Sequence, residues 1–184
     1  MKALDALHSR ISAPRLSEPA PDQSTLDNIY KAAFRAADHG LLRPWRFLVI
    51  RGDSRNQLGE LFLKASLEQD PEIPDEKQAS IRNKPLRAPL ILVSISSLKE
   101  HPKVPQFEQD LSAAAASQNM LVAAHAQGVG AMWRTGSMAY HPLVMKGLGL
   151  TESEKIIGFL YLGTIAGPLK TLSEPNIDDY FKEW

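Results

Sequence analysis

The sequence contains no cysteine among its 184 residues. Disulfide bonds, thiolate metal sites, cysteine-held iron–sulfur clusters and cysteine nucleophiles are therefore excluded. The five histidines are scattered and lack the His-x-x-x-His spacing that places two imidazoles on one helical face. We therefore expect no metal site.

The chain also lacks an excess of either charge, because 21 basic residues balance 21 acidic ones. Long polyanions usually select a basic face, and no basic block occurs here, so we expect no nucleic-acid partner. No apolar run is long enough to span a bilayer, and the N-terminus lacks the apolar core of a signal peptide. These absences predict a cytoplasmic protein without membrane association. A phosphate-bearing small molecule stays possible, since it needs only one or two local cations.

Familiar catalytic motifs are missing as well, including the Gly-x-Ser-x-Gly elbow and the P-loop. Asp38 and His39 are adjacent, but adjacent side chains rarely face one another and no activated nucleophile accompanies them. Gly128-Val129-Gly130 follows a predicted helix and precedes a predicted strand, which is the reverse of a dinucleotide-binding fingerprint. We therefore reject a Rossmann fold and assign no catalytic residue.

What is present is a chain with 43% hydrophobic residues, enough to bury the core of a single domain spanning residues 1–184. Helical spacing predicts helices over residues 4–10, 24–37, 58–65, 108–127 and 142–148. Apolar runs predict strands over residues 47–50, 90–95, 129–133 and 156–163, and the second of these is expected to be buried on both faces. Helices outnumber strands without strict alternation, which favours an α+β fold.

Three further segments are not predicted as regular elements. Residues 11–23 hold three prolines and indicate an irregular connector. Residues 69–84 are polar, and we expect them to be mobile or lid-like. The tail, residues 168–184, carries three aromatic residues, and we expect it to dock, with a partner subunit as one candidate.

Arg10-Ile11-Ser12-Ala13-Pro14-Arg15 places two guanidinium groups and a hydroxyl just past a helix end. Arginine presents forked donors that match a phosphate, and serine adds a neutral donor. The alternative is a solvated connector with helix-terminal charges, which this segment alone favours.

The segment from Arg35 to Trp45 joins a predicted helix end to a loop rich in recognition side chains. Arg35 and His39 are four residues apart, so we expect them on one helical face. Alternatively, both complement the helix C-terminus, where cations are favoured, and Trp45 belongs to the core.

The segment from Gln127 to Gly136 combines glycines with Trp133 and Arg134. Glycines allow the backbone to approach a flat ligand closely, and the two side chains offer an aromatic plane and a cation. The alternative is a glycine cap, a core strand and a surface arginine.

Together and in this order, these segments resemble the nitroreductase family, most closely its short, minimal branch of NAD(P)H nitroreductases. The resemblance covers nearly the whole chain, although no single motif is specific. It rests on Arg10-x-Ser12-x-x-Arg15, Arg35-Ala36-Ala37-Asp38-His39, Arg43-Pro44-Trp45-Arg46-Phe47, Arg87-Ala88-Pro89, Gly128–Gly136 and Ile157–Thr164.

The resemblance implies an α+β fold with a central mixed or antiparallel sheet flanked by helices. It also implies an intertwined homodimer with FMN at the subunit interface, each flavin held by residues of both protomers. By match, the FMN contacts from one chain are Arg10, Ile11 and Ser12, and those from the other are Arg35 and His39. The backbone strip that approaches FMN matches Ala131, Met132 and Trp133.

The nicotinamide nucleotide has a weaker match on the long alanine-rich helix, at Leu121, Val122, Ala123, Ala124, His125 and Ala126. Plain helix core is an equal alternative for this stretch. The chain also departs from the family pattern. Many members have a second basic residue after the first arginine, where Ile11 stands here, so any contact from position 11 is through its backbone. Pro14 stiffens the loop and removes one amide donor.

The implied function is an FMN-dependent oxidoreductase that takes hydride from NAD(P)H and passes it to a nitroaromatic, quinone or similar small-molecule acceptor by a ping-pong cycle. A cation near the reduced flavin is expected, and the residues leave Arg35, His39 and Arg134 as candidates. Alternatives are a non-catalytic flavin-binding or storage protein, another flavin reaction such as dehalogenation, and a helical interaction module without cofactor.

Overall fold

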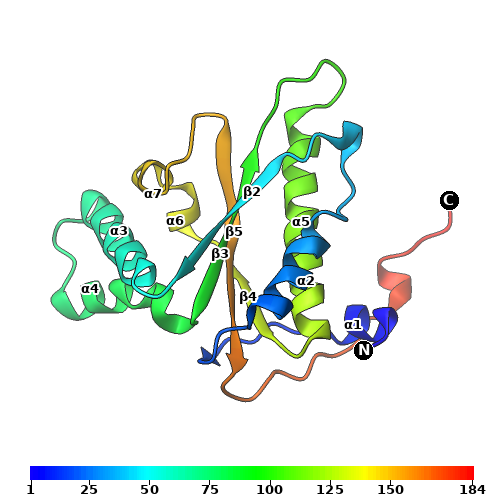
Figure 1. Ribbon diagram of the computed structural model, residues 1–184, viewed down its shortest axis with the longest axis horizontal. Helices are drawn as coiled ribbons and strands as arrows, with labels where there is room; N and C mark the ends of the chain where they lie inside the picture. The colour runs from blue at the N-terminus through cyan, green and yellow to red at the C-terminus, as the bar shows by residue number, and fades with distance from the viewer.

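The computed structural model describes all 184 residues and confirms the α+β fold, with one antiparallel sheet flanked by helices (Figure 1). The strands are β1 (Leu16–Ser17), β2 (Trp45–Arg51), β3 (Leu90–Ser97), β4 (Gly130–Arg134) and β5 (Glu154–Ile165). The sheet order is β1-β5-β3-β2, and β4 also pairs with β5. Every pairing is antiparallel, as expected from the resemblance. None of the helices combines the length and hydrophobicity that a membrane crossing requires.

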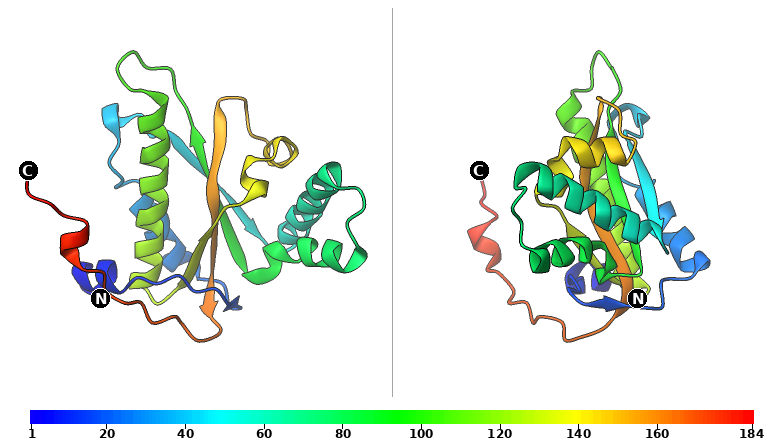
Figure 2. Two further views of the ribbon diagram at one scale, coloured as in Figure 1. Left: turned by 180° about the vertical axis from the view of Figure 1, so that it is seen from behind. Right: turned by 90° about the vertical axis from the view of Figure 1, so that its left-hand side faces the viewer.

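Two helical layers cover the two faces of the sheet (Figures 1 and 2). One face carries α2 (Gln23–Ala33) and α5 (Gln106–Ala126). The other carries α3 (Ser54–Gln69), α4 (Asp75–Arg82), α6 (Ser137–Tyr140) and α7 (Pro142–Gly147). The remaining helical segments are α1 (Ala3–Ser9) and the short 3₁₀ turns η1 (His39–Leu41), η2 (Lys84–Arg87) and η3 (Ile177–Asp179).

Strand β3 lies between β2 and β5, and it is buried on both faces as its continuous apolar run predicts. Its side chains alternate between two cores. Ile91 and Val93 pack with α3, α4, α6 and α7, whereas Leu90 and Leu92 pack with α2 and α5. Because both faces are covered, every residue of the strand except Ser97 at its end is buried.

Small residues let α5 lie close to the sheet. Ala113, Ala116 and Ala124 are buried against it, and the Ser117 and Ser94 hydroxyls lie 2.7 Å apart between helix and strand. The helix ends at the predicted glycine. Gly128 has a φ of +77°, and the Val129 amide donates to the Ala124 carbonyl at 2.9 Å, the backbone bond expected past a glycine helix cap.

Helix α2 ends four residues earlier than predicted. Its expected apolar positions Leu26, Ile29 and Ala33 are buried, but Ala33 is its last residue. From Phe34 the backbone amides bond three residues back instead of four, which tightens the turn. The chain then becomes extended at Asp38, so the segment from Phe34 to Asp38 is not helical.

The expectation of a lid over residues 69–84 is wrong. This segment contains α4, which packs against α3, and its apolar residues Ile73 and Ile81 belong to the core. The polar composition of the segment reflects the outer face of α4. Two well-spaced isoleucines are enough to anchor it, since each buries a full aliphatic side chain.

The aromatic tail does not dock on its own chain. Tyr180, Phe181 and Trp184 are exposed, and the C-terminal segment projects away from the body of the protein (Figures 1 and 2). Docking on a partner subunit stays a prediction. Helix α1 forms as predicted, but its apolar residues Leu4 and Leu7 face solvent, while Ala6 is buried.

Candidate functional site

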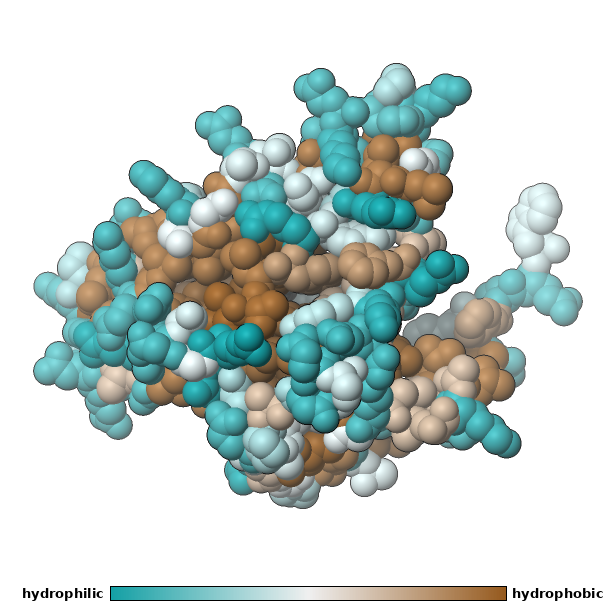
Figure 3. Space-filling model, viewed as in Figure 1, coloured by the Kyte–Doolittle hydropathy of each residue, from teal (hydrophilic) through white to brown (hydrophobic).

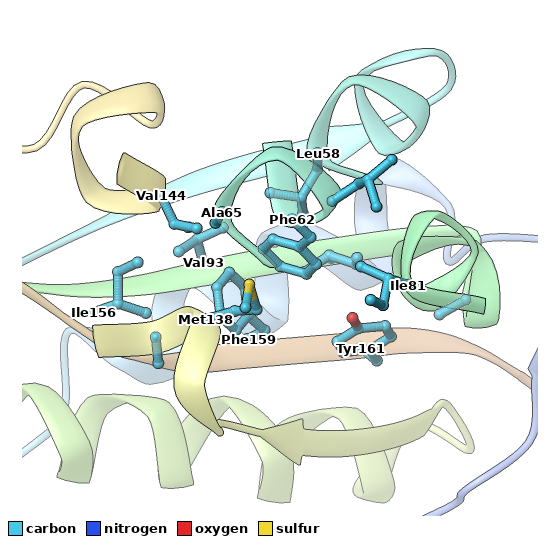
Figure 4. Close-up of a cluster of buried hydrophobic side chains, with 14 of the residues drawn as sticks. Leu58, Phe62, Ala65, Ile81, Val93, Met138, Val144, Ile156, Phe159 and Tyr161 are labelled. Atoms are coloured by element: carbon cyan, nitrogen blue, oxygen red, sulfur yellow. The ribbon is translucent and has the colours of Figure 1, made fainter. Parts of the chain in front are cut away.

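A cavity of about 450 Å³ opens beside β4 on the face of the sheet that carries α3 and α6. Its apolar wall comes from the larger core cluster, in which Phe62, Met138, Phe159 and Tyr161 lie together (Figure 4). The register of β4 on β5 places Met132 opposite Tyr161 and Arg134 opposite Phe159. The complete lining is Phe62, Lys84, Arg87, Met132, Trp133, Arg134, Thr135, Gly136, Ser137, Met138, Phe159 and Tyr161.

The charged residues of this cavity are all cations. Lys84 and Arg87 reach it from η2, and Arg134 reaches it from the end of β4, with no carboxylate in the lining. A second cavity of about 340 Å³ lies next to it and shares Arg87 and Arg134, with Arg15 as a further cation. Aromatic walls and unneutralised cations together suit a flat anionic ligand.

Arg134 is the most constrained of these cations. Its guanidinium carbon lies 5.3 Å from the centre of the Tyr161 ring, within the range of a cation–π contact. Its Nε is buried without a hydrogen-bond partner, and one terminal nitrogen donates to the Pro14 carbonyl at 3.4 Å. Burial lowers the pKa of Arg134, and the nearby charge of Arg87 lowers it further.

Tyr161 supplies an aromatic surface with a protonated hydroxyl. Burial raises its pKa to about 12, although the positive charges of Arg134 and Arg87 oppose that rise. The side chain is therefore neutral at physiological pH, and its hydroxyl can donate a hydrogen bond.

The N-terminal segment and the β4 strip, which are far apart in sequence, lie side by side. The Ala13 amide donates to the Ala131 carbonyl at 2.9 Å, which places Arg10, Ile11 and Ser12 next to the strip. Arg10 is half-buried at the end of α1, and Ser12 is exposed. The structure thus brings together two of the three segments that the sequence singled out.

Trp133 does not form an aromatic plane beside Arg134. Alternation along β4 sends the Trp133 side chain to the α5 face, where its indole Nε1 donates to the Ile157 carbonyl at 3.3 Å. Gly158 makes room for the indole, because a Cβ at that position would lie 2.0 Å from Nε1. The aromatic partner of Arg134 is Tyr161, which strand pairing brings to the same face.

Arg35 and His39 do not share a helical face, so this expectation is wrong. Helix α2 ends at Ala33, which leaves Arg35 exposed in a turn and His39 in η1. The His39 Nδ1 lies 2.6 Å from Oε2 of Glu108, at the N-terminal end of α5. His39 therefore already has an acidic partner within its own chain.

The two predicted groups of FMN contacts lie at opposite ends of α5 (Figure 1). The Ser9 hydroxyl, next to Arg10, lies 2.9 Å from Nε2 of His125, whereas His39 contacts Glu108. At a rise of ~1.5 Å per residue, Glu108 and His125 are ~26 Å apart along the helix. One chain alone does not bring Arg10 and His39 to a common ligand.

Comparison with known proteins shows which family the chain belongs to. A model described as the nitroreductase family matches residues 10–164. An Escherichia coli K12 protein, "Putative NAD(P)H nitroreductase YdjA", is 41% identical over 179 residues, covering 97% of this chain and 96% of the relative. The chain belongs to the nitroreductase family. The resemblance seen in the sequence is thus confirmed.

Solved structures agree with the family in fold. A nitroreductase-like family protein from Bacillus cereus aligns with a TM-score of 0.84 at 22% identity, covering 100% of this chain and 96% of the other. A Desulfovibrio desulfuricans protein, described as a nitroreductase in complex with FMN, aligns with a TM-score of 0.75 at 22% identity, covering 100% and 97%. The arrangement of sheet and helices is therefore a nitroreductase fold.

Residues 121–126 of α5 match the positions expected to contact the nicotinamide nucleotide, and they differ in how deeply they are buried. Leu121 and Ala124 are buried against the sheet, so their side chains belong to the core. The half-buried members, which a nucleotide could reach, are Val122, Ala123, His125 and Ala126. Their contact with a nucleotide stays a prediction.

Sequence reasoning missed Lys84, Arg87 and Tyr161 as members of the site. Arg87 lies in a stretch that carried the family resemblance, but that stretch gave it no role. Lys84 lay at the edge of the expected lid, and Tyr161 lay in a strand expected to be core. Only the pairing of β4 with β5 and the position of η2 bring the three together.

Proposed function

We propose that this protein is an FMN-dependent oxidoreductase that takes hydride from NAD(P)H and passes it to nitroaromatic, quinone or similar acceptors. Family membership and the FMN complex of a nitroreductase of the same fold support this function. The observation that carries it is the cavity beside β4, which has an aromatic wall, three cations and no carboxylate. On this proposal residues 1–184 form one FMN-binding domain, and its cytoplasmic location stays an expectation from the sequence.

The residues present fit the chemistry of FMN. The cavity offers Tyr161 and Phe159 to a flat ring, and the unpaired Nε of Arg134 lacks an acceptor that a ligand could supply. Arg10 and Ser12, beside the β4 strip, offer a forked cation and a hydroxyl to the phosphate. When bound, FMN supplies the two-electron carrier between the nicotinamide and the acceptor.

We further propose that the active molecule is a homodimer with one flavin at each end of a shared interface. A two-fold axis across the middle of α5 places the N-terminal end of one α5 beside the C-terminal end of the other. Arg35 and His39 of one protomer then approach Arg10 and Ser12 of its partner. The two groups of predicted FMN contacts, which lie ~26 Å apart along α5 in one chain, then meet across the interface.

The exposed apolar surface supports that interface. Phe107 and Leu111 on α5 are 69% and 52% exposed, and Leu4, Leu7 and Phe34 also face solvent. Figure 3 shows apolar surface over η1 and the N-terminal end of α5 at the upper right, and beside α1 at the lower right. Large exposed apolar areas of this kind mark protein–protein contacts.

The role of the chain in the reaction is to bind, orient and exclude water. The cavity lining contains no acid–base pair, and hydride transfer between stacked rings requires none. Tyr161, with its raised pKa, stays neutral and does not accept a proton. A single open face over the ring would serve NAD(P)H and the acceptor in turn, as a ping-pong cycle requires.

The visible spectrum of the purified protein tests this proposal. We expect a yellow protein, or one that becomes yellow with added FMN, and we expect NADH or NADPH to bleach it without oxygen. A quinone or a nitroaromatic should then restore the colour, and initial rates should give parallel double-reciprocal plots. Colour that persists with both nucleotides would favour a storage protein. A colourless protein that takes up no FMN would favour an interaction module.

A further inference from the structure

The sequence left three candidates for the cation that stabilises the reduced cofactor, and the structure separates them. His39 is already paired with Glu108, whose Oε2 lies 2.6 Å from the His39 Nδ1. Arg35 is exposed in the turn after α2, at the same end of α5 as His39. Arg134 alone of the three lines the cavity with the aromatic wall.

Arg134 and Arg87 converge without a carboxylate between them. Both line the two neighbouring cavities, and no aspartate or glutamate lines either one. The guanidinium carbon of Arg134 lies over the Tyr161 ring, and the Arg134 Nε is buried without a partner. Arg134 as a whole is half-buried and Arg87 is exposed, but a buried nitrogen donor without an acceptor is destabilising. The arrangement is therefore one that an anion completes.

A reduced flavin ring meets that requirement. Hydride adds two electrons and one proton to a neutral oxidised ring, so the product carries one negative charge until a second proton arrives. A guanidinium is planar and presents forked donors, which suits the adjacent nitrogen and oxygen over which this charge is spread. The low-polarity wall formed by Phe159 and Tyr161 strengthens such an interaction.

We propose that Arg134, supported by Arg87, binds the anionic ring of reduced FMN and raises the midpoint potential of the bound cofactor. This inference rests on the proposed function, and it assigns the phosphate to a different group, Arg10 and Ser12. Arg134 acts on the ring directly, whereas Arg87 reinforces the positive potential from η2.

The test compares wild type with Arg134→Met, which keeps an aliphatic chain over Tyr161 but removes the charge. We measure the dissociation constants of oxidised FMN and of riboflavin, and the midpoint potential of bound FMN by dye-linked titration. The control is Arg51→Met, which removes the same charge from an exposed residue that lines neither cavity.

We expect Arg134→Met to bind reduced FMN about tenfold more weakly relative to oxidised FMN, which lowers the two-electron midpoint potential by ~30 mV. The midpoint potential of Arg134→Lys should lie between those of wild type and Arg134→Met, because lysine keeps the positive charge but lacks the forked donors of the guanidinium. Oxidised FMN should bind within about threefold of wild type, and Arg51→Met should match wild type.

An unchanged midpoint potential in Arg134→Met would overturn the inference. Loss of the preference for FMN over riboflavin would also overturn it, because Arg134 would then serve the phosphate. If Arg134→Met fails to fold, Arg87→Met provides the test, with a smaller fall in potential expected and no change overturning the inference. If the wild-type protein binds no FMN, the proposed function itself is rejected. If the wild-type protein binds FMN and cycles normally, but Arg134→Met leaves the midpoint potential unchanged, only this inference is rejected.

Discussion

At the scale of single residues, one ion pair holds the start of β5 to β2. The Nε and Nη2 atoms of Arg46 donate to the two carboxylate oxygens of Glu154 at 2.6 and 2.7 Å. The Thr151 amide donates to the same carboxylate at 3.0 Å, and Arg46 also reaches the Gly149 carbonyl. Glu154 is buried, so this fork ties the loop before β5 to β2 through Thr151 and Gly149.

The same pair predicts a pH dependence of stability. Hydrogen bonding from Arg46 lowers the pKa of Glu154 from 4.5 to about 2. Because the folded-state pKa lies below the unfolded one, the carboxylate stabilises the fold above pH 4.5, and this contribution is lost as the pH falls toward 2. We expect Glu154→Gln to lower the free energy of unfolding by about 2 kcal/mol at pH 7.

Urea unfolding of both proteins at several pH values measures this effect. The difference between wild type and Glu154→Gln should shrink as the pH falls below 4.5. Glu152→Gln is the matched control, because Glu152 is exposed two residues away. A difference that stays constant from pH 7 to pH 3 would show that the carboxylate charge is not the source of the stabilisation.

At the scale of elements, α5 connects both ends of the proposed site. Its buried face carries alanines and serines against the sheet, and its outer face carries Phe107 and Leu111. Its first turn contacts His39 through Glu108, and its last turn contacts α1 through His125. The length of α5 therefore sets the distance between the two groups of predicted FMN contacts.

The glycine after α5 gives a prediction for this element. Gly128 has a φ of +77°, and a Cβ there would meet no atom within 4 Å. An alanine would therefore be penalised by its backbone conformation and not by a clash. We expect Gly128→Ala to lower the free energy of unfolding by about 1 kcal/mol, and Gly128→Asn to lower it less, because asparagine tolerates this conformation. Thermal and urea unfolding measure both; equal stability of wild type and Gly128→Ala would contradict the assigned cap.

At the scale of the whole molecule, we propose that the site is completed only by two chains. The Arg10 segment and the His39 loop cannot meet within one protomer, because most of α5 lies between them. The apolar surface on α1 and α5 is left uncovered in the single chain. A symmetric dimer accounts for both facts at once.

Mixing two defective variants tests the shared site. We expect Arg10→Ala and the double variant Arg35→Ala/His39→Ala each to bind FMN at least tenfold more weakly than wild type as homodimers. A heterodimer of the two carries both defects in one site and none in the other. Co-expressed and doubly tagged, it should bind one FMN per dimer with wild-type affinity. No recovery in the heterodimer would contradict a site built from both protomers.

The outer face of α5 supplies the control for that experiment. Leu111→Glu places a charge on a half-exposed apolar position that no intrachain core requires. We expect this variant to fold but to sediment as a monomer with weakened FMN binding, and it should fail to complement either partner. A dimeric Leu111→Glu protein would place the interface elsewhere.

The sequence by itself determined the elements whose signals are local. The continuous apolar run of β3, the small-residue face of α5 and the stop at Gly128 were all predicted, because burial spacing and glycine conformation act within a few residues. The order of the recognition segments was also sufficient to identify the family. These elements and the α+β fold could therefore be predicted from the sequence alone.

The tertiary structure alone decided which side chains share a cavity. Strand pairing put Arg134 with Tyr161 and sent Trp133 to the opposite face, and the packing of η2 added Arg87. The expected helical pairing of Arg35 with His39 failed, because α2 ends at Ala33 and the chain then tightens into a turn. Such contacts join residues far apart in the chain, and no local spacing encodes the register or docking angle that creates them.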